Sequence, residues 1–209
     1  MSLTPDMPAA APLASLAPGF PDPVGDAQTT FRAVLDAMAR PGRIARVTAV
    51  PGLDRPLSRA AAAVLLALAD HDTPVWLDRV SAPALPYLRF HTGAPLAVAP
   101  DKAAFAVIGD PEAMPAPDRF ALGTDAYPDR STTLVIEVET LSAGPAAGWR
   151  LEGPGIDGAA HLAVTGLPAG FVEARAALAP LYPRGLDIVL TAGDRLAALP
   201  RTTRITPEG

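Results

Sequence analysis

The chain has 209 residues, enough for one compact domain, and its formal net charge is −5 without any block of like charges. This charge pattern excludes the electrostatic footprint of a nucleic-acid-binding protein. The longest apolar run has ten residues, 60–69, against the ~20 of a membrane span, and no basic, apolar leader opens the sequence. We therefore expect a cytoplasmic protein with no nucleic-acid and no membrane partner.

Composition also limits the chemistry. The chain has no cysteine, which excludes disulfides, thiolate nucleophiles and cysteine-ligated iron–sulfur clusters on this polypeptide. Arginine supplies 16 of the 17 basic residues, so Lys102 is the one candidate for a Schiff base, and its polar turn favours a solvated lysine. Since no G-x-S-x-G string occurs either, we expect no catalytic group and no cofactor on this chain.

The first elements follow from composition and periodicity. Residues 1–23 are rich in proline and alanine without apolar periodicity, so we interpret them as a disordered tail. Phe31, Val34, Leu35 and Met38 recur at helical spacing and predict an amphipathic helix that Asp26 caps and that ends at residues 41–42. A strand over 43–50 follows. Next comes a buried helix that begins after Ser58 and runs to about residue 69.

The rest of the chain alternates short strands with helices. The 25 prolines and 17 glycines favour turns and short elements. The segments predicted as strands are 74–77, 104–108, 132–138, 149–152, 186–191 and 196–199, with a hairpin turn at 193–194, and those predicted as helices are 83–90 and 169–181. We predict an α/β fold with a mixed β-sheet flanked by helices, forming one domain over 24–205 and leaving 206–209 as a C-terminal end.

The glycine string at 153–158 satisfies the G-x-G-x-x-G pattern of dinucleotide-binding folds. No helix of useful length can form before the next Gly-Leu-Pro turn at 166–168, and Asp157 would place a negative charge beside a pyrophosphate. We therefore predict a glycine turn between two strands.

Asp70, His71 and Asp72 offer three possible metal ligands in a row. Consecutive side chains at a helix end point in different directions, and no fourth ligand is evident. We favour a helix terminus in which the aspartates accept bonds from backbone donors of the following turn, and we expect no metal site.

Arg89 and His91 form the best candidate anion patch, because two side chains two residues apart share one side of an extended segment. The alternative is a structural or subunit-contact cluster in which Phe90 fills the core and Arg89 pairs with a carboxylate such as Asp72. The sequence leaves both open.

Arg201 and Thr202 open a second phosphate-compatible segment, 201–204, with two guanidiniums and two hydroxyls. The alternative there is an exposed chain terminus. Glu137 and Glu139 alternate along a predicted strand, and a solvated strand edge explains them.

Five segments together resemble one known family. They are 26–32, 68–77, 88–92, 185–187 and 199–203, in order and at family-like spacing. They are similar to the PhnH family, which belongs to the bacterial carbon–phosphorus lyase core complex, over about residues 24–205. The resemblance implies a fold like the large domain of pyridoxal-phosphate-dependent transferases without the cofactor site, a homodimer, and partners among the other core subunits.

The resemblance also implies a function. The complex attaches a phosphonate to the ribose of ATP with loss of adenine, and a radical subunit later breaks the carbon–phosphorus bond. We expect an accessory, non-catalytic subunit supporting the transfer step, with Asp72, Arg89, His91, Arg201 and Thr202 as ligand or subunit-contact candidates. The alternatives are a stand-alone enzyme, in which Arg89, His91 and Arg201 hold a phosphorylated substrate and Asp72 is the base, and a stand-alone binding protein for a phosphonate.

Overall fold

The main sheet has six strands in the order β1-β9-β8-β4-β3-β2. The computed structural model describes residues 17–47, 56–144 and 148–208. Four neighbouring strands, β2 (Val75–Leu77), β3 (Phe105–Ile108), β4 (Thr133–Glu137) and β8 (Asp187–Ala192), run parallel. The strands β9 (Arg195–Leu199) and β1 (Ala45–Arg46) complete one side by antiparallel pairing. The sheet is thus mixed, as predicted.

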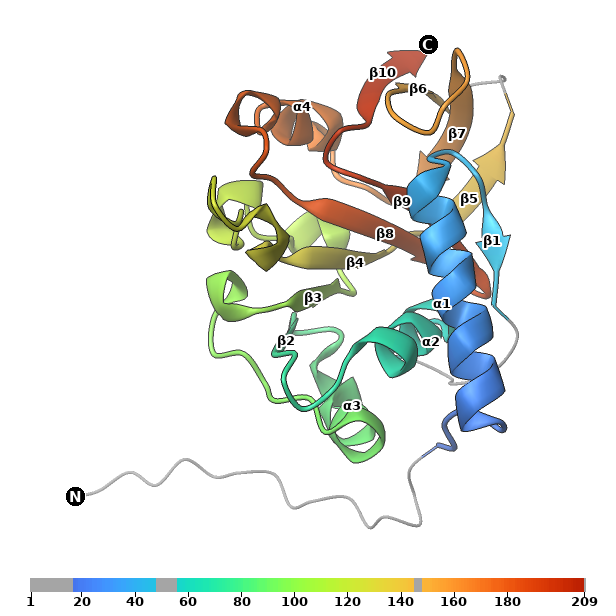
Figure 1. The fold of residues 1–209 in the computed structure, drawn as a ribbon, viewed down its shortest axis with the longest axis vertical. Helices are drawn as coiled ribbons and strands as arrows, with labels where there is room; N and C mark the ends of the chain where they lie inside the picture. The colour runs from blue at the N-terminus through green and yellow to red at the C-terminus, as the bar shows by residue number, and fades with distance from the viewer. Residues whose placement is uncertain (1–16, 48–55, 145–147, 209) are drawn as a thin grey trace, which may run out of the picture.

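Each face of this sheet packs against a different layer. Alternate strand residues Val107, Val135 and Val189 belong to one core cluster with helices α1 (Pro23–Ala39), α2 (Arg59–Leu68) and α3 (Leu85–Thr92). Their neighbours Ile108 and Ile136 belong to a second cluster on the opposite face. Residues 60–65 of the alanine-rich helix α2 are completely buried, because small side chains let the helix lie close to the sheet. Figure 1 shows α1 and α2 crossing in front of the sheet, with α3 beyond β2.

A second sheet covers the opposite face. It has four antiparallel strands in the order β10-β6-β7-β5, and α4 (Phe171–Ala176) packs beside it. Its strands are β5 (Thr140–Ala143), β6 (Gly148–Glu152), β7 (Ala160–Thr165) and β10 (Arg204–Glu208). The sequence predicted only β6 of these, because short, half-exposed strands carry little alternation. In Figure 1, this sheet and α4 lie at the opposite end of the molecule from α3.

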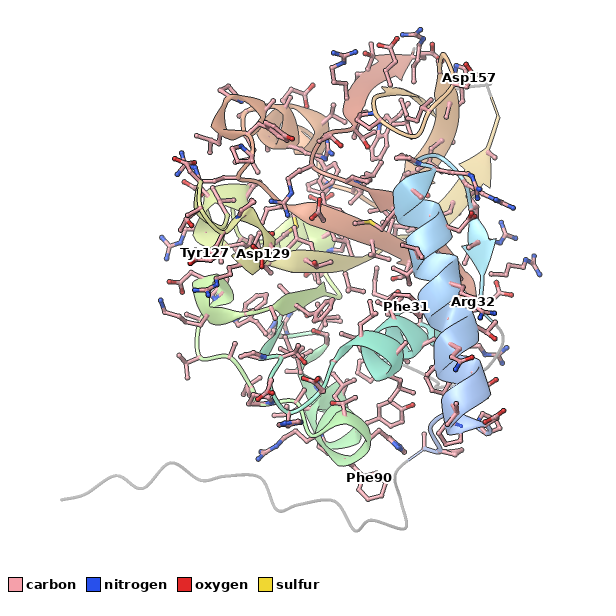
Figure 2. All side chains as sticks on the ribbon, in the orientation of Figure 1. Phe31, Arg32, Phe90, Tyr127, Asp129 and Asp157 are labelled. Atoms are coloured by element: carbon pink, nitrogen blue, oxygen red, sulfur yellow. The ribbon has the colours of Figure 1, made fainter. Side chains whose placement is uncertain are left out.

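The glycine string at 153–158 forms the turn between β6 and β7, as predicted. Gly155 has a φ of +82°, and a Cβ there would collide with the Ala39 carbonyl oxygen at the end of α1. Asp157 lies at the tip of this turn (Figure 2). The turn is thus a packing contact between a hairpin and a helix, and no helix follows it directly.

The ends of several elements differ from the prediction. The N-cap of α1 is Asp22, whose side chain accepts from the Gly25 N–H, while Asp26 in the first turn accepts from the Asp22 N–H. The prediction of Asp26 as the cap was therefore wrong by one turn. The predicted helix 169–181 is interrupted into α4 and a 3-10 turn, η7 (Ala179–Leu181). Part of the predicted strand 43–50 lies outside the described residues, and its described part is β1.

The two ends of the predicted domain also differ. Ala17 and Pro18, in the segment assigned to the tail, contact α3, and residues 206–208, assigned to the C-terminal end, belong to β10. No helix within the described ranges is both long and apolar enough to cross a membrane.

Candidate functional site

Arg89 and His91 lie on a helix, so the extended arrangement that would bring them together does not occur. Both belong to α3, where two residues span about 200° of rotation and place the side chains on nearly opposite faces. Arg89 is exposed. The two side chains therefore do not form one anion patch.

His91 instead packs against its own neighbourhood. Its Nε2 lies 3.0 Å from the Ala17 carbonyl oxygen, and its ring contacts Tyr87 and Phe90 edge-on, with centroids 4.6 and 4.9 Å apart. Tyr87 is desolvated there, which raises the pKa of its phenol to about 12. Phe90 was expected to fill the core in the structural alternative, but it is 54% exposed and points outward in Figure 2.

Asp72 lies in the turn between α2 and β2, beside the end of α3. Asp70 accepts a bond from the Asp72 N–H at 2.9 Å and another from the Thr73 hydroxyl, and these bonds lower the pKa of the Asp70 carboxyl. The predicted helix terminus, in which the aspartates accept bonds from backbone donors of the following turn, is thus confirmed for Asp70. The side chain of Asp72 is highly exposed, and its Oδ2 lies 3.4 Å from His71 Nε2 rather than beside Arg89. Within the described ranges, no cluster of three or more acidic or histidine side chains could hold a metal ion.

Arg201 is the centre of a hydrogen-bond network at the amino end of β8. Its Nη2 and Nε donate to Asp187 at 2.6 and 3.3 Å. Its remaining N–H groups donate to the Pro128 and Pro183 carbonyls and to the Ser131 hydroxyl. All five guanidinium donors are therefore used by the protein, and Arg201 and Asp187 form a largely buried ion pair. The alternative of an exposed chain terminus was wrong here.

Thr202 lies at the rim of an open hollow beside that network. Tyr182, Asp129, Arg201 and the end of α1 at Met38 line the same hollow. Asp129 lies near the amino end of β4 (Figure 2). The side chain of Thr202 adds a hydroxyl to this surface, but the guanidinium of Arg201 has no donor left for a bound group.

The candidate residues thus form two separate groups. Asp72, Arg89 and His91 lie near β2 and α3, whereas Arg201 and Thr202 lie beside β8 and β9. The strands β3 and β4 separate β2 from β8 in the sheet. The candidate residues therefore form neither the anion site nor the acid–base arrangement that the stand-alone-enzyme hypothesis requires.

Asp78 is a buried acidic residue that the sequence did not single out. It follows β2, and its two carboxylate oxygens accept four bonds: from the N–H and hydroxyl of Ser81, and from the N–H groups of Gly109 and Asp110. All four are 2.7–2.8 Å long. Asp78 therefore fastens the carboxyl ends of β2 and β3 together, and nothing in its local sequence pattern indicates this.

Glu137 ends β4 and was wrongly predicted to be solvated. Its Oε1 accepts from the Ser58 N–H at 2.6 Å and its Oε2 from the Thr191 hydroxyl at 3.2 Å. Burial raises the pKa of this carboxyl, and the bonds to Ser58 and Thr191 partly offset that rise. Glu139, the other residue of the pair, is exposed as predicted. Glu137 therefore holds the start of α2 against the sheet.

Comparison with known proteins identifies the family. Residues 18–206 match the model of the bacterial phosphonate metabolism protein PhnH. Over 194 residues, 90% of this chain and 94% of the relative, it is 46% identical to the alpha-D-ribose 1-methylphosphonate 5-triphosphate synthase subunit PhnH of Rhizobium meliloti (strain 1021). A shorter match, 36% identical over 88 residues, covers 42% of the chain and 44% of the putative C-P lyase subunit protein HtxG of Stutzerimonas stutzeri. The resemblance noted in the sequence is therefore confirmed, and this chain belongs to the PhnH family.

Proposed function

We propose that the chain is an accessory subunit of a carbon–phosphorus lyase complex and supports the transfer of a phosphonate to the ribose of ATP, with loss of adenine. The observation that carries this proposal is the 46% identity, over nearly the whole of both chains, to a protein named as a subunit of a ribose methylphosphonate triphosphate synthase. The second relative is likewise named as a C-P lyase subunit. A cytoplasmic location and a homodimer belong to the same proposal.

The distribution of reactive side chains supports a role without catalysis by this chain alone. The two groups of candidate residues lie apart in the sheet, the Arg201 guanidinium is saturated, and the carboxylates of Asp78 and Glu137 accept bonds from backbone N–H groups. The chain also lacks cysteine, so a thiolate-ligated cluster must reside on another polypeptide.

A face of α1 is the surface that we assign to a partner subunit. Val24, Phe31 and Leu35 are spaced by seven and four residues, which places them along one side of the helix, and they are 68%, 49% and 56% exposed. An exposed row of large apolar side chains is typical of a protein contact surface. The relatives' names as subunits favour another chain of the complex as its occupant.

The experiment is co-expression of the tagged chain with the other subunits of its complex, followed by affinity purification. We expect the wild-type chain to bring them down and Phe31→Ser to lose most of that recovery. Val98→Ser is the matched control, because Val98 is 92% exposed but lies outside α1. Recovery of the wild-type chain alone would contradict the proposal, and equal loss in both variants would contradict the choice of surface.

The homodimer is tested separately, by light scattering of the purified chain during size-exclusion chromatography. We expect twice the mass of the 21.5 kDa chain. A single-chain mass across the accessible concentration range would remove the dimer from the proposal without affecting the role in the complex. The proposed likeness to the large domain of pyridoxal-phosphate-dependent transferases rests on the mixed, helix-covered sheet, and a structural superposition with such a domain is its test.

A further inference from the structure

The open hollow beside Thr202 has a volume of about 430 Å³, and most of its wall is apolar. The apolar part is formed by Met38, Tyr182, Pro128, Pro183 and Pro200. Tyr182 is 68% exposed, so a group outside the molecule can reach its ring. Tyrosine and methionine are enriched in protein contact surfaces, and tyrosine is among the residues that contribute most to binding there. The hollow therefore has the composition of a contact site.

The charges around the hollow favour a cation. Arg201 and Asp187 neutralise each other in their ion pair, whereas Asp129 is exposed and forms no ion pair among the described residues. The neighbouring Arg130 is directed elsewhere, because its guanidinium carbon lies 4.2 Å from the centroid of the Tyr127 ring. An anion such as a phosphonate would thus meet a carboxylate and a saturated guanidinium, while a positively charged group would find an unpaired partner.

The hollow continues the apolar side of α1. Phe31, Leu35 and Met38 are spaced by four and three residues, so they follow one another along one side of this helix. Phe31 and Leu35 are 49% and 56% exposed, and Met38, one turn further on, forms part of the wall of the hollow. The surface that we assign to a partner subunit therefore leads directly to the hollow.

The open shape favours an occupant that is held from outside. Sites for free small molecules cover most of the surface of their ligand, which an open hollow does not do. A side chain on a docked protein needs no such enclosure, because the rest of the contact holds it. An arginine has the matching parts: its methylene stem packs on apolar surface, and its guanidinium stacks on an aromatic ring and donates to a carboxylate. Tyr182 and Asp129 offer that ring and that carboxylate.

We propose that this hollow receives an arginine side chain of another subunit of the complex, docked along the apolar side of α1. The inference rests on the proposed role in a complex and adds the position and the chemistry of the contact. The net charge of −5 on this chain also favours a positively charged partner surface.

The test is co-expression of the tagged chain with the other subunits and affinity purification, now with a charge reversal at Asp129. Asp118 provides a matched control, because Asp118 and Asp129 are the exposed middle residues of identical Pro-Asp-Arg turns at 117–119 and 128–130. Asp129→Arg should lower the recovery of the other subunits at least about tenfold, since it places two positive charges together. Asp118→Arg should recover them as wild type does.

The salt dependence separates a charge contact from a change of shape. Asp129→Asn keeps the size of the side chain and removes its charge, so the recovery that remains should depend less on ionic strength than that of the wild-type chain. Asp118→Asn should keep the wild-type salt dependence. Near-ultraviolet circular dichroism of the purified chains establishes that each variant is folded.

The occupant is identified by cross-linking. Because the chain has no cysteine, Thr202→Cys introduces a single thiol at the rim of the hollow, and a photoreactive label is attached there before the other subunits are added. We expect cross-links to another subunit at a segment that contains arginine, and none from the same label at Asp118→Cys.

The outcomes distinguish this inference from the proposed function. Failure of the wild-type chain to recover any subunit would contradict the role in a complex and this contact with it. Normal recovery with Asp129→Arg, or an equal loss with Asp118→Arg, would overturn the contact alone. Cross-links from position 202 only to a second copy of this chain, or to a segment without arginine, would also overturn it.

Discussion

The two ends of the parallel strands differ in how their charged side chains are used. At the carboxyl ends, the carboxylates of Asp78 and Glu137 accept hydrogen bonds from backbone N–H and hydroxyl groups. These bonds hold strands and a helix in place. Near the amino end of β8, the Arg201 guanidinium is satisfied in the same way, but the buried Nε–H groups of Arg175 and Arg184 have no hydrogen-bond partner among the described residues. Open α/β sheets usually bind ligands at the carboxyl ends. In this protein the carboxyl ends of β2, β3 and β4 carry bonds that hold the fold together.

The largest expected effect concerns the carboxyl ends. Asp78→Ala removes a carboxylate that accepts four bonds of 2.7–2.8 Å and leaves the N–H groups of Gly109 and Asp110 without a partner. We expect a loss of about 4 kcal/mol in the free energy of unfolding, since buried donors left unbonded cost more than the bonds themselves contributed. Urea denaturation measures it. Asp118→Ala, at an exposed position, should change stability by less than about 0.5 kcal/mol. A small loss at Asp78 would show that these strand ends are held by packing alone.

The next effect concerns the amino end of β8. Arg201→Ala breaks the ion pair with Asp187 and removes bonds to the Pro128 and Pro183 carbonyls. We therefore expect the free energy of unfolding to fall by about 3 kcal/mol. In the Arg201→Ala background, Asp187→Ala should lower the free energy of unfolding by much less than it does in the wild-type chain, because the two side chains act as a unit. A double-mutant cycle by urea denaturation checks this, and additive losses would mean that the pair is not the source of stability.

A smaller effect is expected at the start of α2. Ser58 caps this helix by accepting from the Ala61 N–H at 3.1 Å, and Ser58→Ala should lower the free energy of unfolding by about 1 kcal/mol. Ser58→Gly should cost only a few tenths of a kcal/mol, because glycine is also tolerated at the N-cap. Thermal denaturation of both variants makes the comparison, and equal losses would assign the effect to something other than the cap.

Glu137 should give the stability a dependence on pH. Its pKa is raised by burial above its ordinary value of 4.5, so the folded state binds the proton more tightly than the unfolded state. This contribution is complete below pH 4.5 and is lost as the pH rises through the raised pKa. Glu137→Gln keeps an oxygen for the Ser58 N–H and should become more stable relative to wild type as the pH rises over that interval. Urea denaturation at several pH values checks it, and a constant difference would contradict the assignment.

The fold was largely predictable where periodicity is strong. The buried strands β3, β4 and β8 and the helices α1 and α2 are marked by continuous or helical apolar patterns. The second sheet was missed, except for β6, because its short strands are half exposed. For the site, the extended arrangement of Arg89 and His91 conflicted with the helix predicted over 83–90, and the structure places both residues on α3. The partners of Arg201 lie 14–73 residues away in sequence, so no local pattern encodes its saturation.

The central claim, an accessory role in phosphonate transfer to ATP, is tested most directly by release of adenine from ATP in the presence of methylphosphonate. The assay compares the complete set of purified complex subunits, the same set without this chain, and this chain alone. We predict release with the complete set, a marked loss when the chain is omitted, and none from the chain alone. Adenine release by the chain alone, or an unchanged rate in its absence, would contradict the account.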